Sequence, residues 1–235
     1  MKRYYILIIL VTAIFSVLIT SCEKDETNVS MTVSGTLEFS ELYNDEITKV
    51  QVDFREPTYW GEVPVFTHVT LARVPYSNGA FSLELPEKVD NKYLNQKLSY
   101  EDLEPYIKVS NKNVKTGVFD FTATDFDEDI ANSIEEKNKE GNGVWTYSYK
   151  TFPLVYLKRD EISTTEGLFY YANENCSITG TLTESDGHQT ITYSMHLKRG
   201  WNIVYHTQTQ DKQMRIEELS TKSVSDMKWY VRGDF

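Results

Sequence analysis

The sequence is short of cysteine and of basic residues, and each shortage excludes a class of protein. Its 235 residues contain two cysteines, Cys22 and Cys176, too few for a fold held together by several disulfides. Asp and Glu number 35 against 24 Lys and Arg, which gives a formal net charge of −11. So acidic a chain repels phosphate backbones and does not suit membrane binding through a basic patch, so we expect no nucleic-acid partner.

The short motifs that mark common enzyme classes are also missing. The sequence contains no Gly-x-Ser-x-Gly elbow, no His-Glu-x-x-His, no Cys-x-x-Cys pair and no phosphate loop. Carboxylates are numerous, so a glycosidase pair stays open, but nothing in the sequence singles out two of them. We therefore predict a non-enzymatic protein without cofactor or metal, with a secreted hydrolase as an alternative.

Aromatic residues, by contrast, are abundant, with 16 Tyr, 11 Phe and 4 Trp. Aromatic and β-branched side chains fit the pleated, half-buried surface of a sheet and favour strands. The apolar content of 40% and the charged content of 25% are ordinary for a globular protein. These proportions predict a folded, mainly β body rather than a disordered chain.

Residues 1–21 have the pattern of a secretory signal peptide. Lys2 and Arg3 give a positive start, and a nearly continuous apolar run follows from Tyr4 to Ile19. This run is shorter than the roughly 20 residues that a membrane-spanning helix needs. We therefore expect a targeting segment rather than a membrane span.

The end of this segment resembles a bacterial lipobox. The residues Leu18-Ile19-Thr20-Ser21 precede Cys22, and the acidic stretch Glu23-Lys24-Asp25-Glu26 follows it. Ser before the cysteine and acids after it resemble the leader and export tag of Bacteroidetes-type surface lipoproteins. The alternatives are an ordinary cleaved signal with an incidental cysteine, and an acidic stretch that serves only as a solvated tether.

The resemblance implies where the protein is located rather than how it folds. In such lipoproteins the cysteine carries a diacylglyceryl group and its amino group is acylated, with fatty acids such as palmitate. Each buried CH₂ contributes about 0.8 kcal/mol, so two or more chains anchor a protein stably. The resemblance therefore implies an outer-membrane protein that is lipid-anchored through Cys22, faces the cell exterior and carries a tether over residues 22–30.

A lipid on Cys22 would leave Cys176 without a partner in the chain. An exported protein normally oxidises paired thiols, so a lone cysteine is expected to be buried and inert. The competing interpretation is a Cys22–Cys176 disulfide in a protein cleaved upstream and not lipidated.

Two hairpins are predicted from alternation and turn residues. Asn78-Gly79 is typical of a two-residue type I′ turn, which would pair Val74 with Leu83. Because Pro75 cannot donate to a ladder, its strand is expected to lie at an edge or to carry a bulge. In the range 190–207, a three-residue loop ending in Gly200 would align the apolar faces of two strands. Further strands are expected at 31–39, 47–54, 144–150, 152–158 and 168–171.

A short helix is expected at 125–140, where several acids crowd the helix start and Gly141 ends it. The segment Ser177–Leu182 also echoes Thr32–Leu37. We therefore predict an antiparallel β-sandwich, with two related prealbumin-like or Greek-key units at 31–120 and 144–235 joined by a helical connector at 121–143.

Candidate metal and adhesion motifs have simpler explanations. In the predicted 190–207 hairpin, His196 and His206 lie about 13 Å apart along the ladder, too far to share one ion. The acids from Asp125 imitate a calcium loop, but its sixth position is Ile130 where that loop needs glycine. The tripeptide Arg232-Gly233-Asp234 resembles an integrin-binding motif and is better explained as the end of a last strand.

The aromatic residues give the best binding candidates. Tyr59 and Trp60 lie between Pro57 and Pro64 in a predicted loop, where aromatic side chains suit sugar rings and protein partners. The alternative is a loop tryptophan folded back on the core. A second aromatic row is expected to pack inside the body, and it comprises Trp145, Tyr147 and Tyr149.

Two function classes remain open beside the hydrolase. The first is a cell-surface binding or adhesion module that captures a glycan or a surface protein. The second is a structural or assembly subunit of a fimbria-like kind, which would need an unpaired strand edge.

Overall fold

The computed structural model describes the chain from residue 31 onward, with gaps. The described residues are 31–43, 45–60, 63–94, 96–97, 106–139, 146, 148–183, 187–211 and 214–232, with backbone only for 56–60, 63–67 and 96–97. The predicted signal peptide, Cys22 and the tether lie outside these residues. The described part is mainly β, which confirms the predicted fold class, and its large, mostly antiparallel sheets are consistent with a β-sandwich.

The elements follow one another in this order: β1 (Thr32–Thr36), η1 (Ser40–Leu42), β2 (Lys49–Trp60), β3 (Val63–Pro75), β4 (Ala80–Glu84), η2 (Asn91–Tyr93), β5 (Gln96–Lys97), β6 (Ile107–Val109), β7 (Lys115–Thr124), α2 (Glu128–Lys139), β8 (Thr151–Arg159), β9 (Ser163–Ala172), β10 (Cys176–Thr183), β11 (Gln189–Leu197), β12 (Gly200–Asp211), β13 (Met214–Ser220) and β14 (Lys228–Val231).

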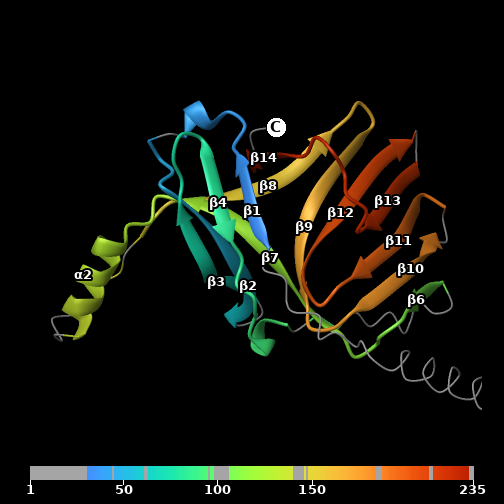
Figure 1. Ribbon diagram of the computed structural model, residues 1–235, viewed down its shortest axis with the longest axis horizontal. Helices are drawn as coiled ribbons and strands as arrows, with labels where there is room; N and C mark the ends of the chain where they lie inside the picture. The colour runs from blue at the N-terminus through green and yellow to red at the C-terminus, as the bar shows by residue number, and fades with distance from the viewer. Residues whose placement is uncertain are drawn as a thin grey trace, which may run out of the picture.

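Most strands belong to one long sheet. Its order is β3-β2-β7-β8-β9-β12-β13-β11-β10-β6, with β14 added to β8 and β5 to β7 (Figure 1). A separate antiparallel pair, β1 and β4, covers the aromatic core beside it. The ladder between β11 and β13 is parallel, whereas the other strand ladders are antiparallel.

The first core is organised around Trp229 on β14. Its ring contacts those of Tyr156, Phe121, Phe81 and Phe169 at centroid distances of 4.9, 5.1, 5.3 and 5.8 Å. These residues come from strands far apart in the chain, so one tryptophan links the β1–β4 pair to the long sheet.

The second core lies inside a curl of the long sheet. β6 and β7 are consecutive strands, and they pair with β10 and β9 at the two ends of the run β10-β11-β13-β12-β9. Figure 1 shows this run bending round toward β6. Buried side chains fill one end of the curl, namely Ile107, Val114, Ala172, Cys176, Ile178, Met195, Leu197 and Val204.

The Asn78-Gly79 turn is confirmed, but the ladder expected beyond it is wrong. Both residues have positive φ, of 52° and 78°, and Ser77 and Ala80 exchange backbone hydrogen bonds across the turn. After that bridge β4 leaves β3 and pairs with β1. The separation lets Phe81 and Leu83 bury against the aromatic core. β3 lies at the end of the strand order, which confirms the predicted edge position.

The hairpin expected at 190–207 is also wrong. β11 and β12 are separated by β13, which pairs with β11 on one side and with β12 on the other. No ladder joins β11 to β12, and the side-chain amide of Asn202 bridges the turn between them instead. This amide accepts a hydrogen bond from Lys198 N at 2.9 Å and donates one to Lys198 O at 2.8 Å. The strands can therefore splay apart and admit a third strand between them.

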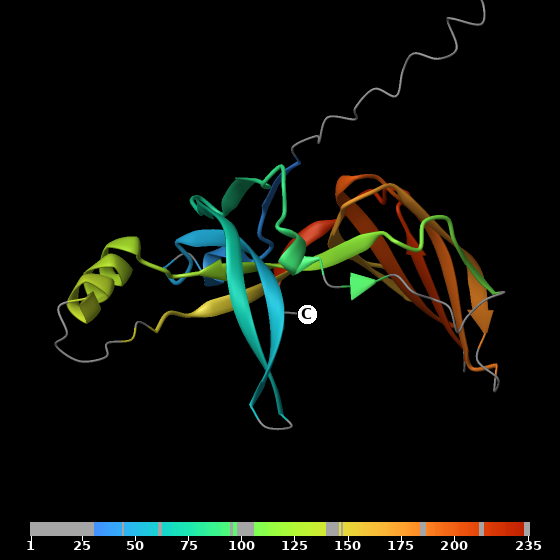
Figure 2. The same ribbon diagram turned by 90° about the horizontal axis from the view of Figure 1, so that it is seen from below.

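The predicted helix is confirmed as α2, which begins at Glu128, directly after Asp127. Asp127 caps its N-terminus, because the backbone N–H groups of Asp129 and Ile130 donate to its carboxylate. α2 has no buried residue and extends away from the sheets (Figure 2). The strand expected at 144–150 is wrong for its described residues 146 and 148–150, which have no strand structure. Tyr149 packs edge-on against Phe126 instead, while Trp145 and Tyr147 lie outside the described residues.

The predicted division into two units stays a prediction, as does their relatedness. The first core draws residues from both predicted units, including Val33 and Trp229. β1 and β10, which carry the echoing segments, lie in different sheets. In the described residues, no helix is both long and apolar enough to span a bilayer.

Candidate functional site

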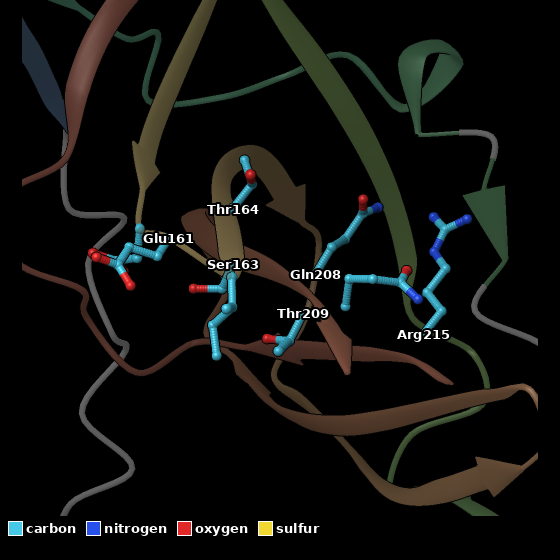
Figure 3. A pocket seen from close by; sticks show the side chains of 9 residues that line it. Glu161, Ser163, Thr164, Gln208, Thr209 and Arg215 are labelled. Atoms are coloured by element: carbon cyan, nitrogen blue, oxygen red, sulfur yellow. The ribbon is translucent and has the colours of Figure 1, made fainter. Parts of the chain in front are cut away.

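A polar groove of about 560 Å³ opens where the β8–β9 connection meets the C-terminal end of β12 and the N-terminal end of β13. Figure 3 shows Glu161 on one side of the groove and Arg215 on the other, with Thr164, Ser163 and Gln208 between them. The lining residues are mostly polar or charged: Asp160, Glu161, Ile162, Ser163, Thr164, Gln208, Thr209, Gln210 and Arg215. Their combination of amides, hydroxyls, carboxylates and one guanidinium supplies both donors and acceptors of hydrogen bonds.

The strand register brings these side chains together. Across β11, β13, β12 and β9, one ladder row contains Ile191, Glu217, Gln208 and Thr164. The next row toward the groove contains Gln189, Arg215 and Gln210. Because side chains alternate between faces, both rows share the inner face of the curl with the second core. The groove is thus the polar end of a surface whose other end is apolar.

A buried carboxylate holds the cationic end of the groove in place. Glu217 Oε1 accepts hydrogen bonds from Gln189 Nε2 and from Arg215 Nε, each at 2.7 Å. Its Oε2 lies 2.7 Å from His206 Nε2. The Glu217 side chain is 8% exposed and that of Arg215 is 52% exposed. We call Gln189, His206, Arg215 and Glu217 the Glu217 cluster.

The cluster compensates for the cost of burying Glu217. An unpaired buried carboxylate is strongly unfavourable, but an adjacent cation and further donors offset its desolvation. The Arg215 guanidinium contacts Glu217 through Nε, and its terminal nitrogens make no hydrogen bond to a described residue. The arginine is therefore oriented by its internal partner and keeps its planar end for a ligand.

Two tyrosines lie on the same inner face. Burial raises the pKa of Tyr193 above its ordinary value, and the negative charge of Glu217 raises that pKa further. Burial also raises the pKa of Tyr170, to which the nearby Tyr193 adds. Both phenols therefore stay protonated at neutral pH and keep their hydroxyl donors.

The histidine register derived from the expected hairpin is wrong, because the hairpin does not form. His196 lies opposite Ser177 of β10, whose Oγ is 3.0 Å from His196 Nδ1. His206 lies opposite Leu219 of β13 and belongs to the Glu217 cluster. Among the described residues, no three His, Cys, Asp or Glu side chains gather closely enough to hold a metal ion.

Tyr59 and Trp60 do not lie in a loop. β2 runs through Trp60, opposite Val63 of β3, and Tyr59 lies opposite Pro64. β2 pairs with β7 over Lys49–Phe54, and beyond Phe54 it pairs with β3 alone among the described strands. Figure 2 shows the end of this two-stranded ribbon extending from the body. The ligand-binding role of the two aromatic residues stays a prediction.

Cys176 is buried, as predicted, and forms no disulfide with a described residue; its Sγ lies 3.5 Å from the carbonyl oxygen of Asn111. The alternative Cys22–Cys176 disulfide stays a prediction, because Cys22 lies outside the described residues. The last strand is also confirmed, as β14, and Arg232 follows it. Arg232 pairs with Glu166 at 2.7 Å, while Gly233 and Asp234 lie outside the described residues.

The groove was missed at the sequence level, although β12 carries a signal for it. Along this strand the apolar alternation of Trp201, Ile203 and Tyr205 gives way to His206-Thr207-Gln208-Thr209-Gln210, which is polar on both faces. Such a change indicates a strand that leaves the core and offers polar groups to solvent or a ligand. The partners of Gln208 on β9 and β13 could not be inferred without the strand order.

No family model, no curated protein and no solved structure matches this chain.

Proposed function

We propose that this protein is a lipid-anchored cell-surface binding module that captures a carbohydrate in the polar groove. The observation that carries the proposal is the lining itself, in which Gln208, Gln210 and Thr164 offer amide and hydroxyl groups on rigid strands. A sugar presents many hydroxyls, each both donor and acceptor, and a lining of mixed donors and acceptors satisfies them. The volume of about 560 Å³ suits a small oligosaccharide.

The arrangement of the chain supports an outward-facing site. Lipidation at Cys22 would tie the body to the membrane through the segment that leads into β1. In Figure 1 the β8–β9 connection that borders the groove is at the upper side of the molecule, and β1 starts below it, near the middle. Nine residues lie between Cys22 and Thr32, and the ten Cα–Cα steps that join them reach at most about 36 Å. A body tied to the membrane through the segment that precedes β1 would therefore present the groove away from the bilayer.

The assembly alternative is favoured by one observation, the edge position of β3. This strand pairs with β2 alone among the described strands and leaves its other edge open to strand addition. However, Pro64 and Pro75 lie within β3, and a proline cannot donate to an added ladder. The edge is thus partly blunted, and the carbohydrate proposal has the stronger geometric support.

A glycan array probed with the full-length protein in detergent tests the proposal. We expect binding to at least one carbohydrate. Replacing both Gln208 and Gln210 by Ala should weaken that binding roughly ten-fold, because each hydrogen bond contributes about 0.5–1.5 kcal/mol. The control is Asn132→Ala, which removes an exposed amide from α2, far from the groove. Failure to bind any sugar, or equal binding by the double variant, would refute the assignment.

A further inference from the structure

We infer that the carbohydrate bound in the groove carries a carboxylate, as a uronic acid does, and that Arg215 receives it. This inference rests on the proposed function and adds the chemical class of the ligand. It starts from the distribution of charge along the groove, which Figure 3 shows as an arginine end and a glutamate end.

Among the described lining residues Arg215 is the one cation, and its described neighbours on the adjacent strand are neutral. The amides of Gln208 and Gln210 lie on the adjacent strand, and Gln210 is directly opposite Arg215 in the ladder. The acids Asp160 and Glu161 line the other end, on the β8–β9 connection. An anionic group is therefore attracted to the Arg215 end and repelled from the Glu161 end, which fixes the direction of the bound chain.

The Glu217 cluster prepares Arg215 for a planar anion. Glu217 bonds the Nε atom at 2.7 Å and is itself held by Gln189 and His206, so the guanidinium plane is set before a ligand arrives. The two terminal nitrogens remain for the ligand, and their spacing matches the two oxygens of a carboxylate in a bidentate pair. A neutral hydroxyl offers these two donors one uncharged oxygen, whereas a carboxylate offers each donor its own charged oxygen.

The position of Glu217 explains why the site would tolerate a second carboxylate. Glu217 is buried and its charge is balanced by Arg215 and by donors from Gln189 and His206. A ligand carboxylate would meet the exposed side of the guanidinium, opposite the side that Glu217 occupies. The negative ligand and the buried carboxylate would thus be separated by the arginine that both contact.

The test compares acidic oligosaccharides with their neutral counterparts. Oligomers of galacturonate, glucuronate and mannuronate are titrated calorimetrically into the full-length protein in detergent, each beside its carboxyl-reduced product and a sulfated neutral oligosaccharide. We expect at least one acidic oligomer to bind ten- to a hundred-fold tighter than its reduced product and than the sulfated sugar. The preference should weaken as salt is raised, because a half-exposed charge pair is screened.

Arg215→Gln should remove this preference. Arg215→Lys should keep only part of it, because a lysine ammonium cannot form a planar, bidentate pair with a carboxylate. The matched control is Arg55→Gln, since Arg55 is 50% exposed and pairs with Asp120 at 2.7 Å on another part of the sheet. A melting curve of each variant confirms that it is folded.

The outcomes distinguish failure of the carboxylate inference from failure of the proposed carbohydrate binding. If the neutral product binds as tightly as the acid, or if Arg215→Gln keeps the preference, the carboxylate inference is wrong while carbohydrate capture stands. A preference for the sulfated sugar likewise overturns the inference in favour of a tetrahedral anion. If neither acidic nor neutral sugars bind, both the inference and the proposed function fail.

Discussion

At the scale of single residues, Gly35 is where the aromatic core leaves least room. A Cβ added to this glycine of β1 would lie 2.5 Å from Cδ1 of Trp229 and 2.8 Å from its Nε1. Gly35→Ala should therefore push the tryptophan against its ring neighbours and destabilise the fold by about 1–3 kcal/mol. Chemical denaturation followed by tryptophan fluorescence measures the change.

Ser34→Ala is the matched control for this substitution, because Ser34 directly precedes Gly35 in the same strand and is exposed. Its effect should stay within about 0.5 kcal/mol. Equal stability of the two variants would mean that Trp229 can move without cost. The sequence pointed to a strand around Gly35 but gave no sign of this contact, since Trp229 lies nearly two hundred residues away and its position depends on the whole sheet.

At the scale of elements, α2 tests how far a local signal determines structure. The Asp127 carboxylate accepts from the backbone of Asp129 at 2.9 Å and of Ile130 at 3.2 Å, and the helix buries no residue against the body. Asp127→Ala should therefore cost the helix about 1 kcal/mol and leave the global unfolding midpoint unchanged. Faster hydrogen exchange of the helix amides, measured by mass spectrometry, would report the local loss.

Asp127→Asn supplies the control, because its side-chain oxygen can still cap the helix. Exchange that stays slow in the Ala variant would show that the helix does not depend on this cap. The helix was predictable from the sequence because its acids, its cap and its length lie within one short segment.

Strand partners were less predictable than strands, for a physical reason. β11 and β12 were recognised by their alternation, yet their pairing was wrong because β13, farther along the chain, inserts between them. Likewise the Asn78-Gly79 turn was correct, but β4 pairs with β1, which precedes it by more than forty residues. Alternation reports which face of a strand is buried, whereas partner choice is settled by contacts between distant segments.

At the scale of the whole molecule, the candidate site depends on that long-range order. The groove combines the β8–β9 connection with the ends of β12 and β13, so its residues approach one another only after the long sheet has formed. The aromatic candidates Tyr59 and Trp60 stood out in the sequence because they are adjacent. A polar site of separate glutamines and one arginine has no such local signature.

The predicted attachment to the outer membrane, in contrast, rests on the sequence alone and has its own test. Cys22→Ala should release the protein from the outer membrane into the soluble fraction, because the predicted acyl chains would supply the binding energy and an acidic chain with a formal net charge of −11 offers no basic patch to replace them. Fractionation of cells and immunoblotting of the membrane pellet measure the change. High salt should not release the unaltered protein, since the predicted attachment is apolar.

Cys176→Ala is the matched control, because it removes the buried thiol and leaves the predicted anchor untouched. That variant should stay in the membrane fraction, with stability reduced only by the lost packing of one small side chain. Were Cys22→Ala to sediment with the membrane as before, some part of the polypeptide would have to hold it there. The orientation argued for the groove would then lose its premise, because the point of attachment would no longer precede β1.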